Sequence, residues 1–268
     1  MIVLRTGTRI RLVRQVDHQA QCGVMARAWG NETFGRPDPY GPLIDAAECH
    51  DEGWRGQDAT PHIDAAGSPV NFTDLDRAIH APMYELGIAE AVVRGAHVGL
   101  LASMHGQGLY ERRMGLDGPC PPRDRRPVYE LAFLRDQERL QAELRAYIGG
   151  GAALESWAWA AYRILQAWDV LSLYLCWNGL AEGREWVLPQ VPRDVGDAAG
   201  IDLRVCACDA TTCTVDPWPF GVAQVDLSVP ARWIDAHPYG SDAELLAAIE
   251  AARQRELALS AVPVTGSG

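Results

Sequence analysis

The sequence predicts a mainly α-helical protein, in which a helical bundle is followed by a small β-rich C-terminal part and a final helix. Apolar residues recur at intervals of three and four through most of residues 12–180, which is the spacing of helices that bury one face. After Glu182 the pattern changes to short runs in which apolar and polar residues alternate, as they do in strands. We therefore expect a helical domain over residues 1–182, a β-rich subdomain with a terminal helix over residues 183–260, and a disordered tail over residues 261–268.

The helical domain is expected to open with short strands at Met1–Leu4 and Arg9–Val13. Apolar recurrence then predicts a series of helices, at Leu12–Trp29, Leu43–Glu52, Pro82–Arg94, Ala96–His105, Pro127–Ile148 and Ala152–Leu180. Pro82 and Pro127 stand where the first turn of a helix tolerates proline. The segment Gly53–Asn71 is rich in Gly, Pro and Asp, so we expect an irregular loop there.

The C-terminal part is predicted to contain a small sheet and one helix. Alternation predicts strands at Ile201–Cys208, Thr211–Val215 and Val222–Val229, with Asp209-Ala210 as a two-residue turn between the first two. Ser241 and Glu244 form a capping box, which predicts a final helix that ends near Leu257.

Charge and composition exclude several classes of partner. All 24 basic residues are arginine, and 35 acidic residues give a formal net charge of −11, so neither nucleic acid nor an anionic membrane is expected as the main partner. Residues 1–13 carry arginines and no long apolar run, which argues against a signal peptide. The apolar segment Ile164–Ala181 contains Asp169 and other polar residues, so we interpret it as a buried helix. Seven cysteines without a secretion signal favour a reduced, cytoplasmic setting.

A few polar residues fall on the apolar faces of the predicted helices: His18, His50 with Asp51, His80, His105 and Asp169. A single histidine on such a face is usually a hydrogen-bonded core residue, so none of the histidines is evidence alone. Asp169 is the only charged residue of Ile164–Ala181, and a buried carboxylate needs either an arginine partner or a metal ion. Together these residue types are the ligands of a buried first-row metal site, where His50 would bind one ion while Asp51 bridges to a second.

The order His, His-Asp, His, His, Asp resembles the HD-domain superfamily of helical metalloenzymes. Several stretches also resemble a bacterial family filed as domain of unknown function 3891, over nearly the whole chain: those around Gln15, Asp17 and His18, around Glu48, His50, Asp51, Gly53 and Trp54, over Ser103–Tyr110, and over Asp216–Phe220. The resemblance implies an HD-domain-like helical bundle. It further implies two metal ions, one held by His18, His50, Asp51 and Asp169, the other by His80 and His105 with Asp51 bridging. His62 or His97 could take the place of His80.

The superfamily resemblance implies two chemistries, oxidation by a di-iron oxygenase and hydrolysis by a metal-dependent phosphohydrolase. We expect the oxygenase, with two iron ions (manganese or zinc being the alternatives) and a small polar substrate. The reason is that Glu48 and Glu52 beside the ligands would repel a polyphosphate. The alternative is hydrolysis of a small phosphate ester or nucleotide, and a third hypothesis is a metal-stabilised binding protein. The sequence leaves open whether the chain forms a homodimer.

Further roles are assigned to residues near the ligands. Glu52 is the candidate general base, together with Asp51 as a catalytic residue. Asp17 and Glu48 are expected to orient ligand imidazoles. The candidates for contact with the substrate are Arg112, Arg113, Tyr110 and Trp54.

Three cysteines form a second candidate site. With Asp209-Ala210 as the turn, Cys206 would face Cys213 across the hairpin and Cys208 would point to the same side. Three thiols on one face suit zinc, with His237 as a guess for the fourth ligand, or two of them could form a disulfide. The alternative, which we favour, is that they are ordinary thiols on a small sheet.

Overall fold

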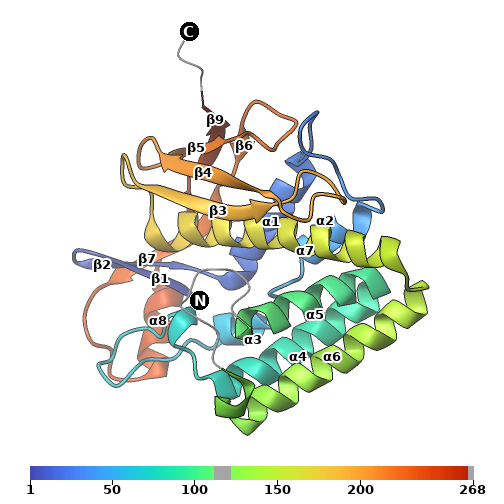
Figure 1. The fold of residues 1–268 in the computed structure, drawn as a ribbon. Coiled ribbons are helices and arrows are strands. Elements are labelled where there is room, and N and C mark those ends of the chain that lie inside the picture. Colours follow the sequence, from blue (N-terminus) through green and yellow to red (C-terminus); the bar gives the residue numbers. More distant parts are fainter. Residues whose placement is uncertain (112–121, 265–268) are drawn as a thin grey trace.

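Helix α7 (Ala152–Leu173) runs through the middle of the molecule, between a five-stranded sheet on one side and the helices α4, α5 and α6 on the other (Figure 1). This computed structural model describes residues 1–111 and 122–264. The remaining helices are α1 (Gln15–Ala28), α2 (Gly41–Ala47), α3 (Trp54–Ala59), α4 (Arg77–Arg94), α5 (Ala96–Tyr110), α6 (Val128–Ile148) and α8 (Asp242–Ala251). Short 3₁₀ turns occur at Phe72–Asp74 and Arg123–Arg125, and a π-helical turn, Tyr174–Asn178, extends α7.

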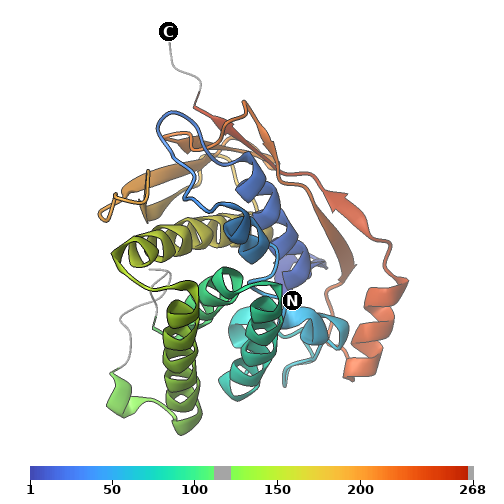
Figure 2. The same ribbon diagram turned by 90° about the vertical axis from the view of Figure 1, so that its right-hand side faces the viewer.

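The strands form two sheets. They are β1 (Ile2–Thr6), β2 (Arg9–Val13), β3 (Glu185–Val191), β4 (Ile201–Ala207), β5 (Thr212–Asp216), β6 (Val225–Asp226), β7 (Val229–Asp235), β8 (Arg255–Leu257) and β9 (Ser260–Pro263). The first sheet has the order β1-β2-β7-β8 and the second the order β3-β4-β5-β9-β6. Figure 2 shows the first sheet edge-on beside α1, with α8 covering its outer face.

The four-stranded sheet joins the two ends of the chain. Strand β2 pairs antiparallel with β1 and with β7, so that Ile10 lies opposite Ile234. These two side chains and Leu12 pack against Leu245 of α8 in a small apolar cluster. The sheet therefore crosses the boundary expected at residue 182.

The prediction of a mainly α-helical bundle is wrong, because two multi-stranded sheets make up much of the fold. The spacing of apolar residues predicted β1 and β2 but not the pairing of β2 with β7, since β7 lies more than two hundred residues away in the chain. Strand β3 was not predicted at all, and β8 occupies residues that the capping-box argument gave to the last helix. The middle of Val222–Val229 forms the two-residue β6, and β7 begins at its last residue.

The chain remains ordered beyond the point where a disordered tail was expected. Residues 260–263 form β9, which pairs parallel with β5 and antiparallel with β6. The alternation in this strand is too short to stand out in the sequence, and its neighbours supply the hydrogen bonds that order it. Residues 265–268 lie outside the described residues.

The segment between α2 and α4 is more regular than its composition suggested. Part of the expected loop Gly53–Asn71 forms α3. Gly53 lies so close to α4 that an added Cβ would come within 2.2 Å of the carbonyl oxygen of Met83, and a Cβ on Gly87 would come within 2.5 Å of the Gly53 nitrogen. Two glycines thus allow the turn before α3 to pack directly on the backbone of α4.

Helix α4 begins earlier than expected. The carboxylate of Asp76 accepts a hydrogen bond from the backbone nitrogen of Ala78, which caps the helix at Arg77 rather than at Pro82. The early start places His80 in the helix. Helix α7, which corresponds to the apolar segment interpreted as buried, has a largely inaccessible second half. None of the helices in the described ranges combines the length and the apolar character that a bilayer span requires.

Candidate metal centre

Four buried side chains converge beside α7. His18 comes from α1, Asp169 from α7, and His50 and Asp51 from the turn between α2 and α3. One ligand atom of each lies within 4.8 Å of the others. None of the four residues is more than 4% exposed, so water screens their charges very little.

The nitrogens and oxygens of this cluster face a common point. The Nε2 atom of His18 lies 3.1 Å from Asp169 Oδ1 and 3.5 Å from Asp51 Oδ2. The Nε2 atom of His50 lies 3.6 Å from Asp169 Oδ1 and 3.8 Å from Asp51 Oδ2. Neither Nε2 atom makes a hydrogen bond of acceptable geometry with a described residue. Two buried imidazole nitrogens without partners, facing two carboxylates, fit a first-row metal ion that would satisfy all four.

The His50-Asp51 pair owes its position to a break in the helix. In a continuing helix the carbonyl of Ala47 would accept a hydrogen bond from the backbone nitrogen of Asp51. Instead that carbonyl lies 3.1 Å from His50 Nδ1, and the Asp51 nitrogen donates to Gln19 Oε1 at 2.7 Å. Helix α2 therefore ends at Ala47. The prediction that His50 and Asp51 lie on a helix over Leu43–Glu52 is wrong, because they lie in the turn that follows α2. A proton on Nδ1 leaves the lone pair of His50 on Nε2, which faces the cluster.

Neighbouring groups also hold the other ligands. The Nδ1 atom of His18 lies 2.6 Å from the hydroxyl oxygen of Ser172, one turn after Asp169 on α7. Tyr84 of α4 donates its hydroxyl proton to Asp51 Oδ1 and accepts a hydrogen bond from Trp54 Nε1 at 3.2 Å. These contacts fix the side chains before any cation arrives.

The carboxylates control the charge of the centre in the metal-free protein. Burial lowers the pKa of His18, but Asp169 and Asp51 outweigh it and raise that pKa to about 9. Burial raises the pKa of Asp51 and of Asp169, but the surrounding histidines outweigh it and hold both pKa values below the usual range. The cluster thus stabilises the ionised form of both carboxyl groups next to a positive charge.

His105 lies on the other side of Asp51. Its Nε2 atom, on α5, is 3.6 Å from Asp51 Oδ1, and neither of its ring nitrogens has a hydrogen-bond partner among the described residues. The two oxygens of Asp51 therefore face different histidines: Oδ2 faces His18 and His50, and Oδ1 faces His105.

His80 of α4 lies in the wall of the cavity beside the cluster. Its Nδ1 atom lies 2.9 Å from the Tyr110 hydroxyl, and its ring packs on Tyr84 with centroids 4.5 Å apart. Burial is the main cause that lowers the pKa of His80 to about 4, so its imidazole is neutral at physiological pH.

A cavity of about 210 Å³ lies against these groups. Its wall combines the candidate ligands Asp51, His80, His105 and Asp169 with aromatic and aliphatic side chains and a few polar groups, namely Gln15, Trp54, Phe72, Thr73, Leu75, Arg77, Tyr84, Leu109 and Leu173. Arg77 is the only cationic side chain in this wall among the described residues. Of the three histidines considered for the second position, His80 lines the cavity. His62 lies 2.8 Å from Asp242, and His97 packs on Trp157.

The residues expected to orient the imidazoles lie elsewhere. Asp17 accepts two hydrogen bonds from Arg14, and Glu48 pairs with Arg27. Both acids lie within two residues of a candidate ligand in the sequence but point to neighbouring arginines instead. The imidazoles are held instead by other groups: Ser172 contacts His18, and the carbonyl of Ala47 contacts His50.

Glu52, the candidate general base, does not line the cavity. It is bonded to Arg55 and to Gln19, whose Nε2 lies 3.2 Å from Glu52 Oε2. Burial raises the pKa of this carboxyl, but the hydrogen bonds from Arg55 and Gln19 lower it overall, so it is a poor proton acceptor.

The predicted substrate contacts divide into three groups. Trp54 lines the cavity, whereas Tyr110 reaches the site through its hydrogen bond to His80. Arg112 and Arg113 lie outside the described residues.

The three cysteines do not share one face. The register places Cys213 opposite Ala207 and Cys206 opposite Thr214, one residue away from the predicted pairing. The turn is longer than two residues because Asp209 accepts hydrogen bonds from the backbone nitrogens of Thr211 and Thr212. Cys213 therefore points into the core, while Cys206 and Cys208 lie towards the surface. His237 lies in the other sheet region and bonds to Pro238.

Sequence reasoning missed several residues of the site. Arg77, Tyr84 and Ser172 have no motif of their own and become visible only when α4 and α7 are placed. One signal was available for Ser172, since it follows Asp169 by three residues and therefore shares its helical face.

Comparison with known families confirms the resemblance to domain of unknown function 3891 over most of the chain, and it shows no membership of the HD-domain superfamily. A family model described as a protein of unknown function (DUF3891) matches residues 1–236. No curated protein and no solved structure is similar enough to register a match. The residues of the candidate centre all lie within the matched range, and the chain belongs to the DUF3891 family.

Proposed function

We propose that this protein is an HD-like dinuclear metalloenzyme that oxidises a small, negatively charged molecule with dioxygen. One observation carries the proposal: one oxygen of Asp51 faces the buried nitrogens of His18 and His50, and its other oxygen faces the buried nitrogen of His105. A carboxylate in that position is suited to bridge two ions, one held by His18, His50 and Asp169 and the other by His105 and His80. The order of these residues along the chain supports the likeness to the HD-domain superfamily.

The ions would supply redox chemistry and polarise the substrate, and the protein side chains would do the rest. Arg77 would bind the anionic group of the substrate with its guanidinium, which lies 5.3 Å from the Tyr110 ring. The aromatic and aliphatic wall would exclude water from the reaction. Tyr84 and Tyr110 would keep Asp51 and His80 in place.

The size and charge of the cavity favour this chemistry over nucleotide hydrolysis. A volume of about 210 Å³ is below the usual range for drug-sized ligands, and a polyphosphate needs more than one cation to neutralise it. A small phosphate monoester would still fit beside Arg77, so hydrolysis is the second outcome that the experiment must separate.

The test is elemental analysis of protein purified without added metal, combined with visible and electron spin resonance spectra. We expect about two iron ions per chain and a mixed-valent signal. His105→Ala should lose about one ion per chain, and His50→Ala should lose at least one, whereas His62→Ala, on the surface, should lose none. Two manganese or zinc ions with turnover of phosphate esters would move the assignment to a hydrolase.

Arg77 gives a second, independent readout. Arg77→Gln should keep the full metal content but weaken substrate binding about tenfold or more, because a charge-assisted hydrogen bond is lost. Metal content that survived both His50→Ala and Asp51→Ala would disprove the proposed centre.

A further inference from the structure

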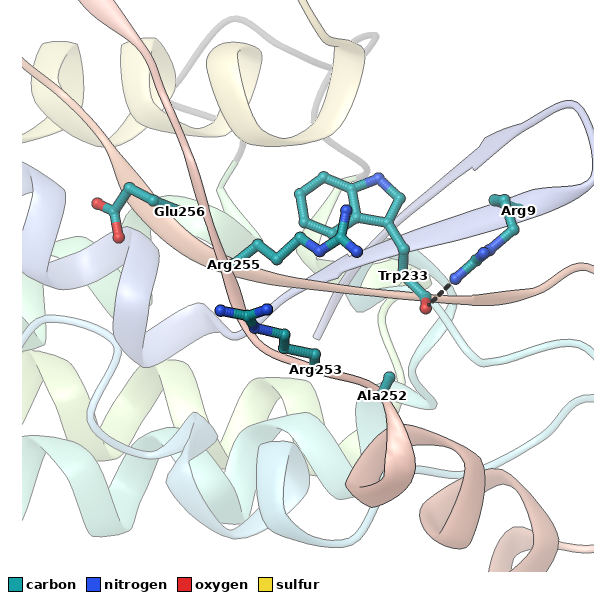
Figure 3. A pocket seen from close by; sticks show the side chains of 6 residues that line it. All are labelled: Arg9, Trp233, Ala252, Arg253, Arg255 and Glu256. Atoms are coloured by element: carbon teal, nitrogen blue, oxygen red, sulfur yellow. Dashed lines mark hydrogen bonds between the residues drawn. The ribbon is translucent and has the colours of Figure 1, made fainter.

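A second hollow, which shares no lining residue with the cavity at the metal centre, lies on the four-stranded sheet. Its volume is about 480 Å³, and it is lined by Arg9, Trp233, Ala252, Arg253, Arg255 and Glu256. Figure 3 shows these side chains on β2, on β7 and on the segment that runs from the end of α8 into β8. Three arginines around one tryptophan are unexpected on a protein whose formal net charge is −11.

The register of the sheet explains why these side chains meet. Arg9 and Arg11 are two residues apart on β2, and Trp233 lies opposite Arg11 on β7. Arg255 of β8 lies opposite Ala231, which is two residues before Trp233. Because residues two apart share a face, Arg9, Trp233 and Arg255 lie on one face of the sheet, opposite the face that α8 covers.

Glu256 does not neutralise this group. It follows Arg255 directly on β8, so its side chain leaves from the opposite face, and Figure 3 shows its carboxylate pointing away from the three guanidinium groups. Arg9 is partly compensated: it lies 3.4 Å from Asp235 and donates to the carbonyl of Trp233. Arg253 and Arg255 have no hydrogen-bond or ion-pair partner among the described residues.

The hollow combines charged guanidinium groups with an aromatic surface. Arg232 donates to the carbonyls of Ile249 and Ala252, which fixes the segment that carries Arg253. Trp233 is half-buried, so part of its indole face is open, and Figure 3 shows Arg255 extending towards it. Two guanidinium forks without acceptors suit a phosphate group, and an indole beside them suits a planar ring.

We propose that this hollow binds a small molecule in which a phosphate group is linked to an aromatic ring, as in a nucleoside monophosphate. The two unpartnered arginines would take the phosphate, and Trp233 would stack on the ring. The site is separate from the metal centre and shares no lining residue with its cavity.

Calorimetric titration of the purified, metal-containing protein with AMP tests the proposal. We expect saturable binding that the double variant Arg253→Gln, Arg255→Gln weakens about tenfold or more, without loss of metal. Arg204→Gln, which removes an exposed arginine from the other sheet, is the matched control and should change the affinity less than about twofold. His50→Ala should bind AMP normally although it loses metal.

Two further ligands separate the parts of the site. Ribose 5-phosphate lacks the aromatic ring and adenosine lacks the phosphate, so each should bind about tenfold more weakly than AMP. Trp233→Leu should abolish the difference in affinity between AMP and ribose 5-phosphate. The proposal fails if AMP does not saturate, if the double variant binds it normally, or if either fragment binds as tightly as AMP.

Discussion

At the scale of single residues, the centre is organised by which atom of each side chain already has a partner. His18 and His50 each use Nδ1 on a fixed neighbour, Ser172 or the Ala47 carbonyl, and keep Nε2 for the cluster. His105 has neither nitrogen bonded among the described residues. In His18 and His50, the contact of Nδ1 therefore decides that Nε2 is left for a metal ion. No spacing rule in the sequence predicts these Nδ1 contacts.

The raised pKa of His18 makes metal binding depend on pH. A metal ion needs the neutral imidazole, but the carboxylates raise the pKa of His18 to about 9, so a proton must leave below that pH. The apparent affinity for Mn²⁺ should rise about tenfold per pH unit up to about pH 9 and then level off.

Calorimetric titrations in two buffers of different ionisation enthalpy give the number of protons released. We expect about one per ion near pH 7.5. Affinity that stays constant from pH 6.5 to 8.5 would show that His18 is already neutral or does not bind the ion.

The centre was easier to predict than its surroundings. His18, the His50-Asp51 pair and Asp169 were predictable because buried polar residues interrupt apolar spacing that is otherwise regular. Asp17, Glu48 and Glu52 lie within two residues of those positions but pair with arginines that are three or 21 residues away in the sequence. Spacing gives the face of a helix on which a residue lies, whereas a partner is decided by what packs there.

At the scale of elements, α4 decides the shape of the cavity. Its first turn carries Arg77 and His80, and its start depends on the cap that Asp76 provides. The glycine contact between Gly53 and the carbonyl of Met83 then holds the helix against the turn that carries Asp51. The sequence predicted this helix from Pro82 onwards and so left its functional turn in a loop.

The cap of α4 can be tested against the cap of α8. Asp76→Ala should cost about 1 kcal/mol of unfolding free energy and, by loosening the turn that holds His80, should weaken binding of the second ion. Ser241→Ala removes the hydroxyl that accepts from the Glu244 nitrogen and should cost a similar amount.

Urea unfolding and metal titration of both variants provide the comparison. Ser241→Ala should leave the affinity for both ions unchanged, since α8 lies on the far face of the four-stranded sheet. Equal loss of metal in the two variants would mean that stability alone, and not the position of His80, accounts for the effect.

At the scale of the whole molecule, both sheets depend on the last part of the chain. The family match ends at residue 236, yet β8 and β9 lie beyond it, and β9 stands between β5 and β6. The longer helices were predictable from the local spacing of apolar residues. The strand order was not, because β8 and β9 pair with strands that lie outside their own stretch of sequence.

A chain shortened to residue 236 should therefore lose its cooperative thermal transition. Removal of β9 leaves the edges of β5 and β6 unpaired and uncovers the core around Leu259 and Ala261. A chain that ends at residue 264 is the control and should melt as the full chain does. Differential scanning calorimetry distinguishes the two, and an intact transition in the shorter chain would show that the five-stranded sheet forms without its fourth strand.

The position of β9 also sets the time at which the protein can finish folding. Chains are synthesised from the N-terminus at about 5–20 residues per second, and β9, which lies between β5 and β6, is the last of the five strands of its sheet to be made. The helices that carry the candidate metal ligands can assemble while synthesis continues, but the gap between β5 and β6 must stay open until β9 has left the ribosome. During that interval the nascent protein exposes two strand edges, and it is then that a chaperone would have most to protect.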